Sequence, residues 1–119
     1  MKLTDKAKVA FEKWYLAEWE PHEDLAVEPL LHVDELRLSG FYQHPISMSY
    51  GIYQDWAESL DWHMYLRPMW NGTYGVYIDS GGQRLLQYTR VSKDLQAGRF
   101  AAIKELDSLY NVYNKSNDR

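Results

Sequence analysis

The chain has 119 residues, of which 45% are hydrophobic and 15% aromatic, and it contains no cysteine. This length fits one domain with one core, and the composition is typical of a folded chain. The lack of cysteine excludes disulfides, thiolate metal ligands and a cysteine nucleophile. Because no stretch approaches the ~20 apolar residues of a membrane span and the first residues are charged, we expect a cytoplasmic protein without membrane contact.

The formal net charge of −4 is distributed unevenly along the sequence. Residues 1–61 hold twelve acids against five bases, whereas residues 62–119 hold eight bases against five acids. Between residues 17 and 61, a single base, Arg37, accompanies ten acids. The sequence therefore predicts an acidic surface in the first half and a mildly basic one in the second.

Two helices are predicted in the first half. Apolar residues follow helical spacing from Thr4 to Trp19, with Thr4 placed to cap the first N–H groups and Pro21 ending the helix. Aromatic and apolar residues recur every three or four positions from Ile46 to Leu60, which predicts a second amphipathic helix. The segment 22–45 is compatible with helix, strand or loop.

The second half predicts three strands in a meander. Apolar and polar residues alternate over 62–70, where Pro68 places the strand at a sheet edge or at a bulge. Asn71-Gly72 suits a two-residue type I′ turn. A second turn at 80–82 then leads into a strand over 85–91.

A C-terminal helix is predicted after Ser92 or Asp94, either of which can cap it. Its expected apolar face comprises Phe100, Ile103, Leu106, Tyr110 and Tyr113. The expected fold is α+β, with two N-terminal helices, a three-stranded antiparallel β-meander and the C-terminal helix packed on the sheet. Residues 1–113 form the single domain in this interpretation, and residues 114–119 a flexible tail.

Motifs of enzymes and metal sites are missing from the sequence. The four histidines lack the spacing of metal ligands, and no phosphate-binding loop, dinucleotide fingerprint or nucleophile elbow occurs. Paired carboxylates such as Glu23 and Asp24 are typical of a solvated face. We therefore expect no catalytic residues, no cofactor and no metal, and a non-enzymatic function. Five tryptophans and ten tyrosines are many for so small a core, so a homodimer and a monomer remain equally open.

Two candidate binding surfaces follow from charge and aromatic content. The first is acidic and includes nearby aromatic residues (Tyr42, Tyr50, Tyr53, Trp56 and Trp62), a combination typical of protein-binding surfaces. Its carboxylates are Glu23, Asp24, Glu28, Asp34, Glu35, Asp55 and Glu58. The second is basic and lies among tyrosines, which suits nucleic acid. Its residues are Arg67, Arg84, Arg90, Lys93 and Arg99.

The segment Ala10-Phe11-Glu12-Lys13-Trp14-Tyr15, followed downstream by Tyr50-Gly51-Ile52 and Asp55-Trp56-Ala57, resembles a family of small accessory proteins encoded in the early regions of tailed phages and prophages of enteric bacteria. The likeness covers about a third of the chain, and Ala57-Glu58 departs from the alanine-tryptophan repeat of that family. The resemblance implies a phage origin, residence in the host cytoplasm and a non-essential accessory role.

The function expected from residues and resemblance together is binding of a host or phage macromolecule through the acidic, aromatic surface. Inhibition of a nucleic-acid-handling or defence complex is the role that we associate with such a surface. The alternative is a small nucleic-acid-binding module that uses the arginines of the β-hairpin region. The order of three strands and a helix is similar in outline to the arm-type DNA-binding domain of phage integrases.

Overall fold

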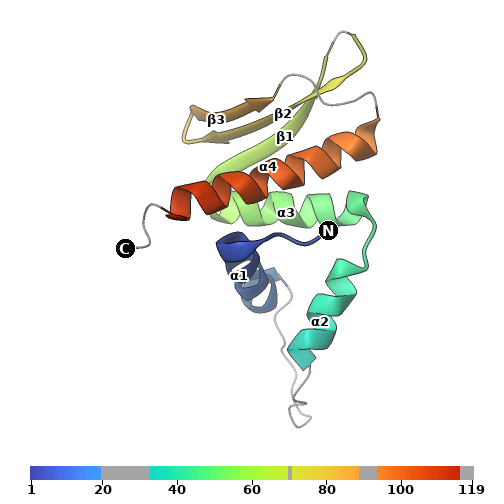
Figure 1. Cartoon of the computed structure of the whole chain (residues 1–119), viewed down its shortest axis with the longest axis vertical. Coiled ribbons are helices and arrows are strands. Elements are labelled where there is room, and N and C mark those ends of the chain that lie inside the picture. The colour runs from blue at the N-terminus through green and yellow to red at the C-terminus, as the bar shows by residue number, and fades with distance from the viewer. Residues whose placement is uncertain (20–32, 70, 89–93, 116–119) are drawn as a thin grey trace.

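The structure is a computed structural model that describes residues 1–19, 33–69, 71–88 and 94–115. In chain order, the described residues form α1 (Asp5–Trp14), the π-helix η1 (Tyr15–Trp19), α2 (Val33–Tyr42), α3 (Ile46–Ser59), β1 (Trp62–Pro68), β2 (Tyr74–Ser80), β3 (Gln83–Tyr88) and α4 (Leu95–Lys115). The sheet occupies one end of a molecule 54 Å long, α2 occupies the other, and α3 and α4 lie between them (Figure 1).

The α+β architecture expected from the sequence is confirmed. The sheet is antiparallel with strand order β1-β2-β3, and α4 packs against β1 and β2 while α3 packs against β1. The two expected N-terminal helices are α1 with η1, and α3; the segment left open contains α2 in its second part. Helix α4 continues to Lys115, past the expected domain boundary at residue 113. Among the described helices, none is long and apolar enough to span a membrane.

The type I′ turn lies at the second hairpin. Gly81 and Gly82 both have positive φ, 55° and 83°, between Ser80 and Gln83, which pair with each other. Two consecutive residues of positive φ match the right-handed twist of the flanking strands. The Gly-Gly pair supplies these angles without the steric cost of a Cβ.

The expected type I′ turn at Asn71-Gly72 is wrong. Gly72 has a φ of 85°, but Asn71 does not share the positive φ that this turn requires of both residues. A longer loop closes instead where the N–H of Met69 donates to the carbonyl oxygen of Thr73 at 2.8 Å. The Asn71 side-chain oxygen accepts from the Thr73 hydroxyl at 2.6 Å and from its N–H at 3.2 Å, which stabilises this loop.

Aromatic rings from the first three helices form the centre of the core. Phe11 of α1 and Tyr53 of α3 are fully buried, with ring centroids 4.6 Å apart. Phe41 of α2 lies 5.0 Å from Phe11. Trp56 extends this cluster toward α4, because its ring lies 5.1 Å from that of Tyr110. Contacts of this kind combine a large buried apolar area with favourable ring geometry.

The expected place of Phe100 in the core is wrong. Its side chain is 48% exposed, whereas Ala102, Ile103 and Leu106 are fully buried. Successive residues are about 100° apart around a helix, so Phe100 lies about 200° from Ala102. The sequence shows an apolar stripe along α4. Because α4 contacts both α3 and the sheet, its buried face is instead centred on Ala102 and its buried neighbours. Tyr113, also assigned to this stripe, is likewise exposed.

We expect Phe11→Ala to lower the free energy of unfolding by about 3–5 kcal/mol, because it removes the ring at the centre of the core. Phe100→Ala serves as the matched control and is expected to cost about 0.5 kcal/mol, as for an exposed position. Urea unfolding measures both values. Equal costs for the two variants would contradict this description of the core.

The free energy of unfolding is also expected to fall at alkaline pH, because two buried tyrosines resist ionisation in the folded state. Burial raises the pKa of Tyr50 to about 12 and also raises the pKa of Tyr53, whose hydroxyl donates to the carbonyl oxygen of Met1 at 2.6 Å. In the unfolded chain tyrosine ionises near pH 10. Above that pH the unfolded state loses protons that the folded state keeps, so the contribution present below pH ~10 is lost as pH rises.

For Tyr53 alone, the expected loss is about 1.4 kcal/mol per pH unit above pH ~10. Tyr53→Phe keeps the buried ring and removes the ionisable group, so its stability should fall less steeply with pH. Urea unfolding from neutral pH to about pH 11 gives both slopes. Parallel slopes for the two proteins would show that Tyr53 ionises in the folded state as it does in the unfolded chain.

Candidate functional site

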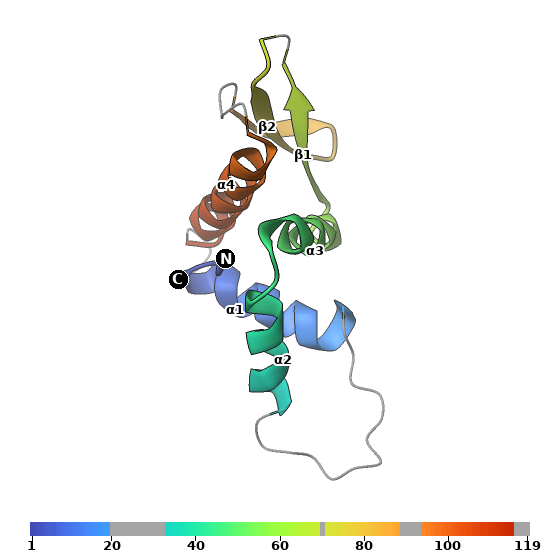
Figure 2. The ribbon, with the colours of Figure 1, turned by 90° about the vertical axis from the view of Figure 1, so that its right-hand side faces the viewer.

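The candidate site is the face of the sheet that α3 and α4 do not cover, which we call the open face. It comprises His63, Tyr65 and Arg67 of β1, Tyr77 and Asp79 of β2, and Arg84 of β3. Strand residues alternate between two faces, and the inner face packs under α3 and α4, with Met64, Val76 and Ile78 buried. The alternate residues therefore face away from these helices. Figure 2 shows β1 and β2 standing above α3 and α4 at the end of the molecule.

Stacked aromatic rings run across the open face. Tyr65 and Tyr77 are directly paired across β1 and β2, and their rings are nearly parallel, with centroids 5.3 Å apart and planes at 10°. The His63 ring lies 5.1 Å from Tyr65 on β1. Tyr77 is only 3% exposed although it lies on the open face, because its neighbours on the same face cover it.

Two guanidinium groups complete the stack around Tyr77. Arg84 lies 4.8 Å from the centroid of the Tyr77 ring and Arg67 lies 5.8 Å from it. Arginine stacks on aromatic faces in this way while its edge keeps donors for other groups. We call His63, Tyr65, Tyr77 and Arg84 the stacked row of the open face.

Asp79 connects the two ends of this arrangement. Its Oδ1 accepts from Nε of Arg84 at 2.9 Å, and its Oδ2 accepts from the Tyr65 hydroxyl at 3.1 Å. Burial and this hydrogen bond raise the pKa of Tyr65 above its usual value, and the bond to Asp79 raises the pKa of Arg84. The carboxylate thus fixes the orientation of a phenol and a guanidinium.

Of the basic residues expected at a nucleic-acid site, the structure brings Arg67 and Arg84 together. Arg67 is exposed, and the described residues provide no carboxylate within ion-pair distance of it. Arg99 does not join them, since it lies on α4, where it donates to the side chain of Gln96 at 2.7 Å. Asp79 and His63 were not expected at this site, although the period-2 alternation of the strands places both on the face of Tyr65 and Tyr77.

Five residues of the two expected surfaces lie outside the described residues. They are Glu23, Asp24 and Glu28 of the acidic surface, and Arg90 and Lys93 of the basic one.

The four remaining carboxylates of the expected acidic surface are exposed but do not lie together. Asp34 and Glu35 are in the first turn of α2, whereas Asp55 and Glu58 are near the end of α3. Because the end of α2 leads into the start of α3, the two pairs occupy opposite ends of this helix pair (Figure 1). Asp34 also pairs with Arg37 at 3.5 Å.

The aromatic residues expected beside these acids belong to the core. Tyr50, Tyr53 and Trp56 are buried, and Tyr42 is half-buried with its hydroxyl donating to Glu12 at 2.6 Å. The helical spacing of Tyr50, Tyr53 and Trp56 marks the inner face of α3. The sequence alone does not distinguish such a buried face from a binding surface. An acidic surface with an aromatic centre is therefore not formed by the described residues.

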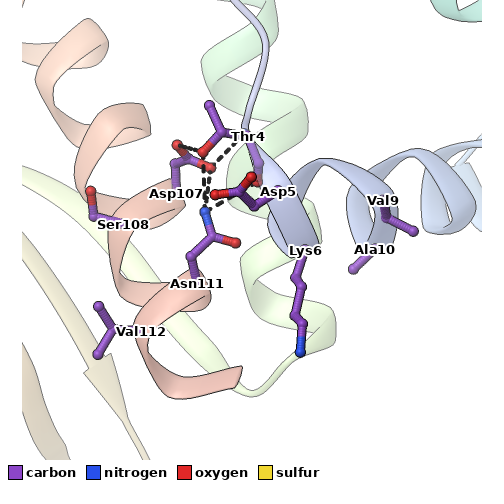
Figure 3. A pocket seen from close by; sticks show the side chains of 9 residues that line it. All are labelled: Thr4, Asp5, Lys6, Val9, Ala10, Asp107, Ser108, Asn111 and Val112. Carbon is purple, nitrogen blue, oxygen red and sulfur yellow. Dashed lines mark hydrogen bonds between the residues drawn. The ribbon is translucent and has the colours of Figure 1, made fainter. Parts of the chain in front are cut away.

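A groove lies between the start of α1 and the end of α4 (Figure 3). It has a volume of about 940 Å³, with the exposed side chains of Val9 and Val112 on its walls. Its floor is polar: the N–H and hydroxyl of Thr4 donate to Asp107 at 2.8 and 2.9 Å. Asn111 accepts from the N–H of Ala7 at 2.8 Å.

The bonds to Asp107 and Asn111 cap the start of α1 with side chains of α4. Thr4 does not cap its own helix as expected, because its hydroxyl is used on Asp107. The side-chain oxygen of Asn111 takes the role instead, and its nitrogen donates to the Thr4 carbonyl at 3.1 Å. The polar groups of the groove are thus engaged in holding α1 on α4, so we regard the groove as structural.

Asn111→Ala should lower the free energy of unfolding by about 1–2 kcal/mol, because it leaves the N–H of Ala7 without its cap. Ser108→Ala changes an exposed residue of the same groove and is the control, expected within about 0.5 kcal/mol of the natural protein. Thermal or urea unfolding decides between them. A neutral Asn111→Ala variant would show that the cap contributes nothing.

No group of three or more histidine and acidic side chains suited to a metal ion occurs within residues 1–19, 33–69, 71–88 and 94–115. In comparisons with known proteins, no family model matches the chain, and no characterised protein or solved structure matches it significantly. The open face must therefore be interpreted from its own chemistry.

Proposed function

We propose that this protein is a non-enzymatic binding module that holds single-stranded nucleic acid on the open face of its sheet. The observation that carries the proposal is the convergence of Arg67 and Arg84 on the ring of Tyr77 within a stacked row of aromatic side chains. Proteins that bind single strands combine guanidinium groups for the backbone with flat side chains for the bases.

Arg67 is the group that we assign to the phosphates. It is exposed, and its guanidinium is placed over Tyr77 rather than against a carboxylate of the described residues. Such a guanidinium has donors directed at solvent in a fixed orientation, which matches the oxygen pairs of a phosphate.

The ends of the stacked row are the positions that we assign to the bases. Tyr77 is covered by its neighbours, so a base reaches the row at the exposed His63 ring or at the Arg84 guanidinium. Stacking of a base on a flat side chain contributes about 1–3 kcal/mol and tolerates any base. The row therefore suits a strand of mixed sequence.

The charge of the described strands is weakly positive. Residues 62–69 and 71–88 contain the bases Arg67 and Arg84 and the acid Asp79, whereas residues 1–61 have a balance of −7. A polyanion therefore meets less repulsion at the strands than at the acidic helices of the first half.

The phage origin and the host cytoplasm rest on the resemblance alone, and three of the seven carboxylates of the acidic docking surface lie outside the described residues. The origin, the location and the docking surface stay predictions, as does a homodimer. The acidic surface has lost its aromatic component to the core, so we favour the open face.

We expect fluorescence anisotropy to show binding of a labelled oligothymidylate of about 16 nucleotides, with affinity falling as salt rises. Arg67→Ala should weaken binding and reduce the slope of log K against log salt by about 0.7, the value for one lost phosphate contact on a single strand.

Arg99→Ala is the matched control, because it removes the same charge from α4 and should leave the affinity and slope unchanged. Absence of binding by the natural protein, or an equal loss in both variants, would contradict the assignment of the open face. Binding of duplex in preference to the single strand would also contradict it.

A further inference from the structure

Asp79 is an acid at the centre of a surface that we assign to a polyanion. The strand register places it opposite His63 on one side and Arg84 on the other. Both carboxylate oxygens are engaged, one by Arg84 at 2.9 Å and one by the Tyr65 hydroxyl at 3.1 Å. A site that attracted nucleic acid by charge alone gains nothing from a carboxylate here.

The carboxylates near the open face offset much of its positive charge. Asp79 neutralises Arg84, and Glu58 of α3 lies 3.5 Å from His63. Among the described residues of the face, this leaves Arg67 as the charge without a paired carboxylate. Stacking does not depend on net charge, so these carboxylates weaken phosphate attraction while the stacked row remains intact.

We infer that Asp79 is a specificity-determining residue that makes the open face prefer unpaired strands to other polyanions. This inference rests on the proposed function. A duplex offers phosphates but hides the faces of its bases, so repulsion by Asp79 lowers its affinity with no stacking in return. A single strand meets the same repulsion and offsets it by stacking on the row.

Asp79 also positions Arg84 and Tyr65, and this structural role must be separated from the effect of its charge. Asp79→Asn keeps one oxygen acceptor of nearly the same shape and removes the charge. Asp79→Glu keeps the charge and lengthens the side chain. Asp55→Asn removes one charge from an exposed site on α3 and gives a protein of the same net charge as Asp79→Asn.

The experiment measures affinity for oligothymidylate and for a duplex of the same length, over a range of salt concentrations, in the natural protein and the three variants. Asp79→Asn is expected to bind both ligands more tightly and the duplex by the larger factor, so that the single-strand preference falls several-fold. The salt slope should steepen in this variant. Asp55→Asn, which lies outside the open face, should keep the natural preference. Asp79→Glu keeps the charge but displaces the carboxylate, so it should still discriminate against the duplex while its affinity for both ligands falls.

The outcomes distinguish a failure of this inference from a failure of the proposed single-strand binding. If the natural protein binds the single strand and Asp79→Asn keeps its preference, the inference is overturned and the proposed function stands. If Asp79→Asn weakens both ligands equally, Asp79 only positions its neighbours, and the inference again fails. If neither protein binds either ligand, both proposals are overturned. Unfolding curves of all variants, with Asp79→Ser as a second charge-removing variant, show whether any loss reflects the fold.

Discussion

The aromatic contacts of Phe11 hold together the elements on which the open face depends. The ring is fully buried on α1, and five rings of α1, η1, α2 and α3 lie within 5.9 Å of it, those of Trp14, Tyr15, Phe41, Tyr53 and Trp56. The contact of Trp56 with Tyr110 joins this cluster to α4. Because α3 and α4 are fixed by these contacts, they cover one face of a three-stranded sheet, and the other face is left to the arginines and tyrosines.

The separation of core and surface aromatic residues explains how so aromatic a chain forms a small domain. Most rings of the helices are buried against one another, whereas the rings of the open face are stacked side by side across strands, with Tyr77 covered by its own neighbours. The guanidinium groups of Arg67 and Arg84 lie over the Tyr77 ring of the open face, whereas helices cover the rings of the core. The result is a polar, aromatic surface at the end of the molecule opposite to α2. Guanidinium groups and flat rings are side chains that contact phosphates and bases in nucleic-acid-binding proteins.

The fold follows from the sequence where the pattern is periodic. Alternation over 62–70 and helical spacing over 46–60 predict β1 and α3. Asp94 caps α4 through a bond from the N–H of Gln96 at 3.1 Å, as expected. Periodicity does not tell which side of an apolar stripe is covered, so the sequence alone predicts Phe100 in the core and Tyr53 on a binding surface. The cap of α1 by Asn111 joins residues far apart in the sequence, so the local sequence does not encode it. The loop at Asn71-Gly72 is set by local hydrogen bonds of Thr73 to Met69 and Asn71, which replace the type I′ turn. The sequence predicts the two arginines of the site and places them among tyrosines. It does not predict Asp79 at the site or which rings contact each other, because the strand register determines both.

The most direct test of this account is a map of backbone amide chemical shifts during titration with a single-stranded oligonucleotide. The account predicts that changes concentrate on β1, β2 and β3, at the residues flanking Tyr65, Tyr77 and Asp79, while the first turn of α2 and the groove at Asn111 stay unchanged. Shifts confined to α2 and the end of α3, or spread evenly over the molecule, would contradict the assignment of the open face as the binding surface.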